Sequence, residues 1–353
     1  MLLENIINMV NRNELKNIIN KIKSIITLKT ELYDKLFEVL LELNEHYNRI
    51  EDENYNYSYN YMFAPYLYLG ASNKVNIKEY YNKTKCNNII LAFLNYDTGF
   101  PQWSDGINYY SGGIDEVVHF IHEKQGNIII SSGGANGIEL TNKMSVDECF
   151  KIYKYFYDVY QIKHFDFDIE GIYLGNNSLV LKRCQLIKEI KKQVPNAIIQ
   201  YTIPISPDGL HNDSKNLLIT SKQENVIPDI INLMTMDFGI YYAPNGNTDM
   251  AKYCIQCIEN VEKQLKEYYI ESKIGVTPMI GLNDCNDEVF SLSNARELVS
   301  YCKNKNNIKL LSFWCINRDN GSKPNCNYAD CNFSSIEQKL FEFSCIFNNK
   351  SCE

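Results

Sequence analysis

The stretch from His164 to Gly171 carries three carboxylates at alternate positions, Asp166, Asp168 and Glu170. Side chains of a β-strand alternate between its two faces, so the three acids share one face, and the intervening Phe, Phe and Ile share the other. Acids two positions apart lie roughly 7 Å from each other. If this face is buried, the repulsion between like charges favours a proton on at least one carboxyl, which suits a general acid. A solvent-exposed acidic sheet face is the alternative for this segment alone.

Eight short apolar segments after residue 60 predict the strands that would position these acids. They are Met62–Leu69, Ile89–Leu94, Ile128–Ser132, Phe165–Glu170, Ile198–Ile203, Ile230–Met236, Ile274–Met279 and Leu310–Trp314. The intervening segments are long enough for helices, such as Asp147–Tyr160 and Leu179–Gln193. This alternation predicts an α/β fold, a (β/α)8 TIM barrel. An open, doubly wound sheet is the alternative, but no Gly-x-Gly-x-x-Gly follows the first strand to support a dinucleotide fold.

The active site of such a barrel lies at the C-terminal ends of its strands. Polar and glycine-rich motifs fall at these ends. They are Ser131-Ser-Gly-Gly-Ala-Asn-Gly137, the acidic run ending at Glu170, Met234-Thr-Met-Asp237, Val276-Thr-Pro-Met279-Ile-Gly and Ser312-Phe-Trp314. We therefore expect them to meet around one site.

These motifs, with Phe63-Ala-Pro-Tyr66 and Leu91-Ala-Phe-Leu94 on the first two strands, resemble in order those of the bacterial-type branch of glycoside hydrolase family 18, the chitinases and their relatives. The family carries Asp-x-x-Asp-x-Asp-x-Glu on its fourth strand. The last three acids match Asp166, Asp168 and Glu170, whereas Lys163 stands at the first position. The resemblance runs from about residue 62 to residue 319.

The resemblance implies hydrolysis of β-1,4 N-acetylglucosamine linkages in chitin or chito-oligosaccharides, with retention of configuration and with assistance from the substrate's own acetamido group. Glu170 would donate a proton to the leaving oxygen and then act as a base on water. Asp168 would bind the acetamido N–H and stabilise the oxazolinium intermediate. Asp166 would share a proton with Asp168. No cofactor and no metal ion are expected.

Substrate-binding positions follow from the same resemblance. Trp314 would form the floor under the sugar, with a core tryptophan as the alternative. Asp237 would assist the acetamido group or Glu170, with a structural role in holding the loop as the alternative. The other expected substrate-binding residues are Tyr66, Gly134, Met234 and Met279. The methionines are as consistent with barrel filling as with a pocket wall, and Trp103 with covering the barrel as with lining the cleft.

Residue 238 is a departure from the family. Relatives of this branch commonly have Tyr at this position, where the chain has Phe238. If a phenol there orients the acetamido oxygen, its loss slows the reaction unless Tyr241 or Tyr242 replaces it.

Composition limits the partners. The 353 residues carry a net charge of −8, which argues against a nucleic-acid partner. No run reaches the ~18–20 apolar residues of a membrane span, and the first residues do not resemble a signal peptide. We expect a monomer, either cytoplasmic or exported by another route, although the family is commonly secreted.

Two domains are expected: a helical extension and linker at residues 1–58, and the catalytic barrel at residues 60–347. Among the 12 cysteines, Cys254 and Cys257 are expected as two thiols of one helix. Cys326 and Cys331 lie in a loop-like stretch and could pair in an oxidising compartment.

Two further functions remain open on the sequence. One is an endo-β-N-acetylglucosaminidase acting on N-glycans, since substrate choice depends on loop shape. The other is a chitinase-like carbohydrate-binding protein with weak or no activity, which the presence of Glu170 disfavours.

Overall fold

The computed structural model describes residue 17 and residues 61–243, 249–285 and 288–351. The chain divides into two compact units, Met1–Ser58 and Tyr59–Glu353. The expected N-terminal helix and linker lie outside the described residues, apart from residue 17, so the helical extension stays a prediction. No helix among the described residues is long and apolar enough to cross a membrane.

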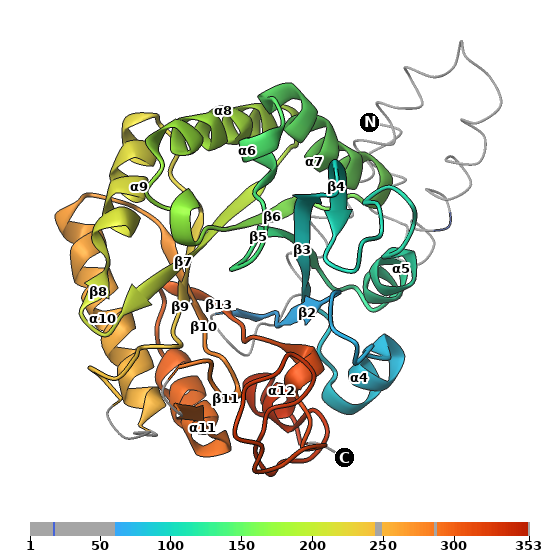
Figure 1. Cartoon of the computed structure of the whole chain (residues 1–353), viewed down its shortest axis with the longest axis vertical. Helices are drawn as coiled ribbons and strands as arrows, with labels where there is room; N and C mark the ends of the chain where they lie inside the picture. The colour runs from blue at the N-terminus through green and yellow to red at the C-terminus, as the bar shows by residue number, and fades with distance from the viewer. Residues whose placement is uncertain (1–16, 18–60, 244–248, 286–287, 352–353) are drawn as a thin grey trace, which may run out of the picture. The chain divides into compact units, whose positions relative to one another are not determined.

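The second unit contains a ring of parallel strands surrounded by helices (Figure 1). In the described part of the chain, the ring strands are β1 (Met62–Phe63), β2 (Tyr66–Tyr68), β3 (Ile89–Asp97), β5 (Ile128–Gly133), β6 (His164–Asp168), β7 (Ile198–Ser206), β9 (Ile230–Met234), β10 (Lys273–Thr277) and β13 (Ile308–Leu311). Their order in the sheet is β1-β13-β10-β9-β7-β6-β5-β3-β2.

The first strand closes the ring because its two halves, β1 and β2, lie at the two ends of this order. Met62 pairs with Leu310 of β13, whereas Tyr66 pairs with Ile90 of β3. Between the halves, the Ala64 N–H donates to the Leu311 carbonyl at 2.9 Å. The predicted (β/α)8 barrel is confirmed: each predicted strand overlaps a strand of the ring, and the first, Met62–Leu69, is divided into β1 and β2.

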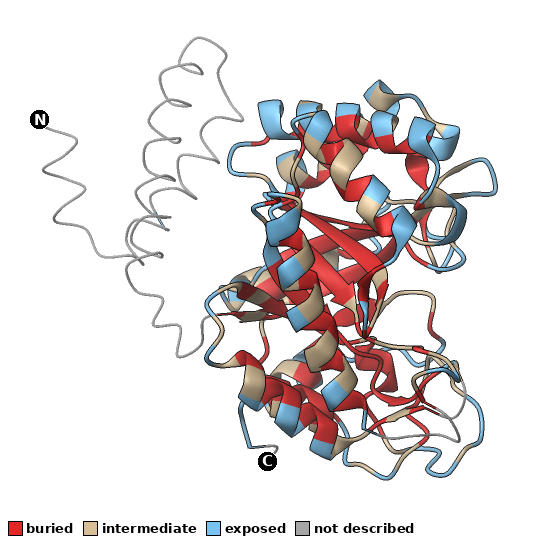
Figure 2. Ribbon diagram, turned by 90° about the vertical axis from the view of Figure 1, so that its left-hand side faces the viewer, coloured by how far each residue is buried: buried red, intermediate tan, exposed pale blue. Residues whose placement is uncertain are grey.

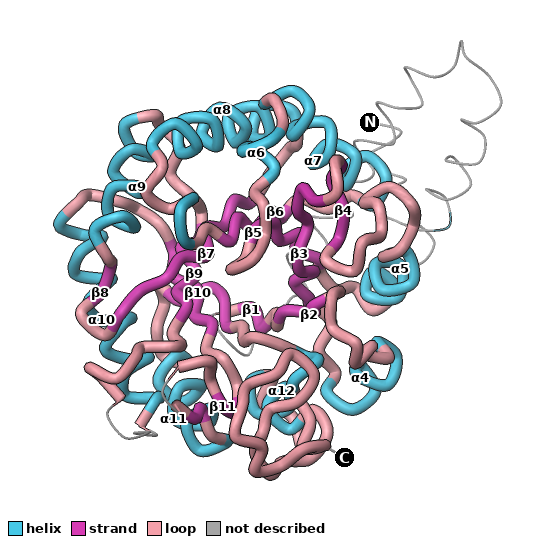
Figure 3. Tube along the Cα trace, in the orientation of Figure 1, coloured by secondary structure: helices cyan, strands magenta, loops and turns pink. Residues whose placement is uncertain are grey.

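The surrounding layer consists of helices that bury one face against the strands (Figure 3). They are α4 (Ile77–Thr84), α5 (Asp115–Glu123), α6 (Leu140–Lys143), α7 (Val146–Tyr160), α8 (Asn177–Gln193), α9 (Asn212–Gln223), α10 (Met250–Glu267), α11 (Leu292–Cys302) and α12 (Glu342–Phe347). Short strands β4 (Phe100–Trp103), β8 (Gly209–Leu210), β11 (Gly281–Leu282) and β12 (Val289–Phe290) and the 3₁₀ turns η2 (Gly171–Tyr173) and η3 (Ile316–Arg318) lie in the connections.

Helix α7 illustrates how the sequence forms this layer. Ser145 caps its N-terminus in a capping box with Glu148. Its buried residues Cys149, Ile152, Tyr153, Phe156 and Tyr160 recur at three- and four-residue spacing, which places them on one face. The opposite faces of the helices are exposed, whereas the strands are buried (Figure 2).

The cysteines behave mostly as small apolar residues. Cys254 and Cys257 are fully buried on α10, as expected for two thiols of one helix. Cys326 and Cys331 are free thiols, so the suggested pairing is wrong in this structure. Both lie in the partly exposed loop between β13 and α12, where sequence proximity alone does not bring two sulfurs together.

Candidate active site

A cleft of about 830 Å³ opens at the C-terminal ends of the strands. Its lining includes Tyr66, Gly134, Asp168, Glu170, Met234, Asp237, Met279 and Trp314. These are the expected site residues with the exception of Asp166, which lies beneath them in the barrel. Segments from at least six strands thus converge on one cavity, as expected for a barrel of this kind.

The alternation predicted for β6 places its acids inside the barrel. Asp166 is fully buried and accepts hydrogen bonds from Tyr66 Oη at 2.9 Å, Ser131 Oγ at 2.7 Å and Thr202 Oγ1 at 2.7 Å. On the opposite face, Phe165 packs edge-on against Tyr153 of α7. The alternative prediction for this segment, an acidic sheet face exposed to solvent, is therefore wrong.

The three hydroxyl donors have a direct electrostatic effect on Asp166. Burial raises the pKa of this carboxyl to about 6, and the hydrogen bonds oppose the shift because they stabilise the ionised form. Tyr66 and Thr202 are held in turn by the Asn232 amide at 3.3 and 3.0 Å. The buried charge on Asp166 thus has a complete set of donors.

Asp168 and Glu170 lie above Asp166 and face the cleft. The pKa of Asp168 is raised well above its ordinary value, first by burial and then by the charges of Glu170 and Asp166. Burial, followed by the charge of Asp237, raises the pKa of Glu170 to about 7. The Oδ1 atom of Asp168 is buried and has no protein hydrogen-bond partner. A group on the ligand that donates a hydrogen bond would satisfy it.

Asp237 follows β9 and is held at the cleft by the next loop along the chain. Its Oδ1 atom accepts the backbone N–H groups of Asp284 at 2.8 Å and Cys285 at 3.1 Å. Burial, followed by the charge of Asp284, raises the pKa of Asp237 to about 6. Because the charge of Asp237 also raises the pKa of Glu170, the two carboxylates act on each other across the cleft.

An aromatic group forms one wall of the cleft. The Trp314 ring stacks on Phe93 with ring centroids 5.3 Å apart and an interplanar angle of 14°. Tyr66 and Tyr68 contact the same indole at 5.9 and 5.3 Å. Trp314 is only partly buried, so one part of the indole remains available to a ligand.

The two glycines after β5 allow the loop to approach its neighbours closely. Gly133 and Gly134 have φ angles of +109° and +85°. A Cβ atom on Gly133 would lie 2.0 Å from the Asp168 carbonyl oxygen, and one on Gly134 would lie 2.7 Å from the Phe93 ring. Any larger residue would therefore displace the acid or the aromatic wall.

The hypothesis about residue 238 is wrong for this structure. Phe238 does not line the cleft. Its ring packs edge-on against Tyr253 of α10, with centroids 5.8 Å apart. Tyr241 is 83% exposed, the Tyr242 hydroxyl donates to Asp208, and neither residue lines the cleft. After β9 the cleft-lining residues are Met236 and Asp237, whereas Phe238, which follows the left-handed backbone at Asp237, is buried against α10.

Several cleft residues were missed from the sequence. They are Tyr68, Phe93 and Arg318, which line the cleft. Trp103, for which lining the cleft and covering the barrel were both open, does both: it lines the cleft and packs against Phe156. Arg318 is fully buried and donates to the carbonyls of three loop residues, Ile280, Leu282 and Asp330. Period-two alternation could have identified Tyr68 beside Tyr66, but Arg318 follows the last strand in an irregular loop.

The charge of the lining is strongly unbalanced. Its carboxylates are Asp97, Asp105, Asp168, Glu170, Asp237, Asp284 and Asp330, and among the described lining residues the cation is Arg318. Since the Arg318 guanidinium is engaged with backbone carbonyls, the cleft disfavours an anionic ligand. The described residues contain no cluster of three or more His, Cys, Asp or Glu side chains that could hold a metal ion.

The barrel and this row of acids at the end of β6 define a glycosidase-type site. No family model matches the chain. A probable bifunctional chitinase/lysozyme of Escherichia coli is 28% identical over 305 residues, which cover 81% of this chain and 34% of that protein. Endochitinase 11 of Metarhizium anisopliae is 29% identical over 279 residues, or 73% of this chain and 52% of that protein. The chain thus spans about a third of the length of the Escherichia coli protein and about half of the length of the Metarhizium protein.

Solved structures agree with this relationship. The catalytic domain of a hyperthermophilic chitinase from Pyrococcus furiosus superposes with a TM-score of 0.72 at 28% identity, covering 82% of this chain and 94% of that one. Catalytic-site mutants of the Pyrococcus enzyme have been solved in complex with chito-oligosaccharides. Together with the ordered strand motifs, these similarities support the resemblance of the chain to the chitinases of glycoside hydrolase family 18.

Proposed function

We propose that this chain hydrolyses β-1,4 linkages between N-acetylglucosamine residues of chitin or chito-oligosaccharides, with retention of configuration and assistance from the substrate's acetamido group. The observation that carries the proposal is the row of acids at the C-terminal end of β6, in which Asp166 and Asp168 are buried and Glu170 is partly buried, below a cleft with an aromatic wall. Similarity to enzymes named as chitinases supports chitin as the substrate class.

Glu170 is the proposed general acid. Its raised pKa, about 7, keeps a proton available near neutral pH. Once the proton has passed to the leaving oxygen, the ionised Glu170 serves as a base for the incoming water. The nearby charge of Asp237 favours the protonated form at the start of the cycle.

Asp168 is the proposed partner of the acetamido group. Its unpartnered Oδ1 atom supplies an acceptor for the acetamido N–H, which would orient the carbonyl oxygen toward the anomeric carbon. The ring closure produces a positively charged oxazolinium ion, and the carboxylates beneath and beside it stabilise that charge. Asp166, with its three hydroxyl donors, holds negative charge while a proton remains shared with Asp168.

The remaining site residues have binding roles in this proposal. The partly exposed indole of Trp314 forms the floor for the apolar face of the sugar ring. Tyr66, Gly134, Met234 and Met279 shape the walls around the reacting sugar. The acidic lining accepts the neutral N-acetylglucosamine unit and disfavours sugars that carry sulfate, phosphate or uronate groups.

The test compares two substrates under the same conditions, soluble chitohexaose and a glycoprotein carrying N-glycans. Cleavage of chitohexaose with the β-anomer as the first product by proton NMR is expected. Release of N-glycans without cleavage of chitohexaose would instead identify an endo-β-N-acetylglucosaminidase. An α-anomer as the first product would contradict substrate assistance, and binding without hydrolysis would identify a carbohydrate-binding protein.

A further inference from the structure

Glu288 is a fully buried carboxylate that the proposed reaction does not use. It lies just before β12 and does not line the cleft. Its Oε2 atom accepts the backbone N–H of Phe238 at 3.0 Å, and its Oε1 atom accepts that of Gly239 at 2.6 Å. Both acceptor atoms thus bind the two residues that directly follow Asp237.

Asp237 has an unusual backbone conformation at this point. Its φ angle is +52°, in the left-handed region that residues with a Cβ atom rarely adopt. Such a conformation costs free energy and persists only where the surrounding structure holds it. Here the Asp237 N–H donates to Asn283 Oδ1 at 3.3 Å. The Asn283 amide is itself anchored on the Met279 carbonyl at 2.9 Å.

Hydrogen bonds run in both directions between the loop that follows β9 and the loop that follows β10. Glu288 and Asn283 accept N–H groups from residues 237–239, and Asp237 Oδ1 accepts the N–H groups of Asp284 and Cys285. We call Asp237, Asn283 and Glu288 the loop clamp. It fixes the backbone on both sides of the Asp237 side chain, which lines the cleft and acts electrostatically on Glu170.

We propose that Glu288 is a positioning residue: it holds residues 237–239 in the left-handed turn that directs the Asp237 carboxylate toward Glu170. This inference rests on the proposed function, in which Glu170 is the general acid. A purely structural role for Glu288 would affect stability alone. A positioning role also sets the pH range over which Glu170 retains its proton.

Several charged groups act on Glu170, Asp237 and Glu288, and the experiment must separate their effects on the pKa of Glu170. Glu170 is influenced by Asp168, two residues before it at the end of β6, and by Asp237 of the loop after β9. Asp237 is influenced by Asp284 and by Arg318. Glu288 itself interacts with Asp237, with the Cys285 thiol and with the Cys254 thiol on α10.

Asp319 offers a matched control. It is also fully buried, and it accepts the backbone N–H groups of Phe343 at 3.0 Å and Ser344 at 2.8 Å. These residues lie in the first turn of α12, and Asp319 does not line the cleft. Asp319→Asn therefore removes a charge of the same kind, with the same type of backbone partner, at a place without contact to Glu170.

The experiment measures the pH profile of kcat/KM on soluble chitohexaose for wild type, Glu288→Gln and Asp319→Asn. In Glu288→Gln one carboxylate oxygen becomes an amide that cannot accept an N–H, so the turn relaxes and Asp237 moves away from Glu170. We expect the alkaline limb to move to lower pH by about 1 unit. Asp319→Asn is expected to lower the melting temperature without moving this limb.

A second pair of variants tests the route of the effect. In an Asp237→Asn background, Glu288→Gln should cause no further shift, since the charge through which it acts is gone. Asn283→Ser removes the acceptor of the Asp237 N–H and should move the limb in the same direction as Glu288→Gln. If Glu288→Gln does not fold, Asn283→Ser tests the loop clamp in its place. An unchanged limb in the folded clamp variants, or an equal shift with and without Asp237, overturns the proposal.

A measurement made without substrate tests the positioning role of Glu288 independently of the proposed function. Titration of the Glu170 carboxyl by carbon-13 NMR should show a lower pKa in Glu288→Gln than in wild type. If wild type cleaves no chitohexaose but this shift is present, the proposed function fails while the positioning role stands. If wild type is active and the Glu170 titration is unchanged in Glu288→Gln, the positioning role fails alone.

Discussion

At the scale of single residues, the proton on Glu170 is the feature on which the proposed reaction depends. Glu170→Gln keeps the shape of the side chain and removes the transferable proton. We expect kcat on chitohexaose to fall by at least ~10²–10⁴-fold, the usual contribution of general acid catalysis. The dissociation constant for the oligosaccharide, measured calorimetrically, should change little. Glu271→Gln, at an exposed position, is the control. Near-wild-type turnover in Glu170→Gln would remove Glu170 from the role of acid.

Phe238 provides a second test at this scale. The family resemblance suggests a residue near the acetamido group, whereas the structure places its ring outside the cleft. The ring packs against Tyr253 outside the cleft, so an added hydroxyl has no route to the acetamido group. We expect Phe238→Tyr to change kcat by less than about twofold, or under ~0.5 kcal/mol in the activation free energy. A tenfold rise in kcat would show that this phenol reaches the substrate after all.

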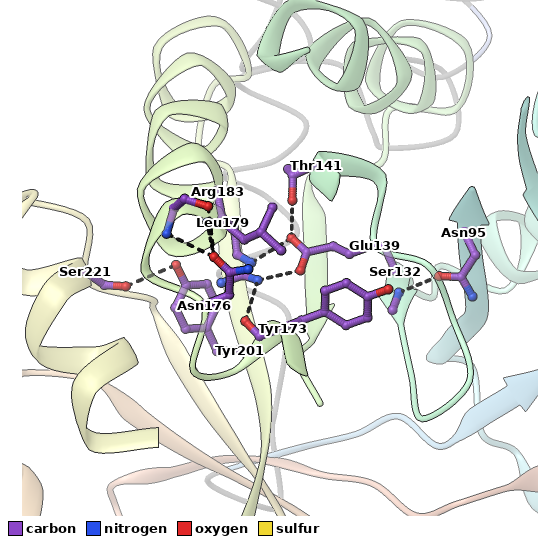
Figure 4. Close-up of polar contacts among 12 residues, drawn as sticks. Asn95, Ser132, Glu139, Thr141, Tyr173, Asn176, Leu179, Arg183, Tyr201 and Ser221 are labelled. Carbon is purple, nitrogen blue, oxygen red and sulfur yellow. Dashed lines mark hydrogen bonds and ion pairs between the residues drawn. The ribbon is translucent and has the colours of Figure 1, made fainter. Parts of the chain in front are cut away.

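At the scale of elements, a buried ion pair joins the loop after β5 to helix α8 (Figure 4). The Arg183 Nε atom donates to Glu139 Oε1 at 3.0 Å, and Nη2 donates to Oε2 at 2.5 Å. Nη2 also contacts the Tyr173 carbonyl at 3.5 Å, in the turn that follows Glu170. Two loops that border the cleft are thereby attached to one helix, since Glu139 follows the glycine-rich segment and Tyr173 follows the acid.

Breaking this pair on one side should be costly. Arg183→Met leaves the Glu139 charge buried without its partner, and we expect the free energy of unfolding to fall by about 3–5 kcal/mol in urea denaturation. The double variant Arg183→Met/Glu139→Gln should recover part of that loss, because no buried charge then remains. Lys188→Met, which removes the exposed pair with Glu224, should cost under ~1 kcal/mol. Strictly additive effects of the two buried substitutions would contradict this account.

The elements were largely predictable from the sequence, whereas their connections were not. Apolar runs located the strands of the barrel, and helix α7 begins within one residue of its predicted start. The Glu139–Arg183 pair spans 44 positions, and the loop clamp joins residues about 50 positions apart. Such contacts depend on how the layers stack and on turn geometry, which local periodicity does not encode. The position of Phe238 outside the cleft has the same cause, since the left-handed backbone at Asp237 interrupts the alternation of the strand.

At the scale of the whole molecule, the site places several carboxyls where ionisation is unfavourable. Burial raises the pKa of Asp166 and Asp237 to about 6 and that of Glu170 to about 7, in a molecule of net charge −8. A group whose pKa is raised by folding stabilises the protein while it is protonated, and this contribution is lost as the pH rises through its folded pKa. The site therefore lowers stability most at alkaline pH, where the proposed acid is also ionised.

This linkage gives a test that needs no substrate. Glu170→Gln abolishes the ionisation at position 170, so its stability relative to wild type should be greater at pH 8.5 than at pH 5. Each unit by which folding raises a pKa corresponds to 1.36 kcal/mol, and we expect a difference of at least ~1 kcal/mol. This equals about 2–4 °C in melting temperature for a domain of this size. Glu271→Gln, measured at both pH values by calorimetry, controls for the loss of one negative charge. If the advantage of Glu170→Gln over wild type is the same at pH 5 and pH 8.5, Glu170 does not titrate between them, and the proton that the proposed reaction requires is not held there.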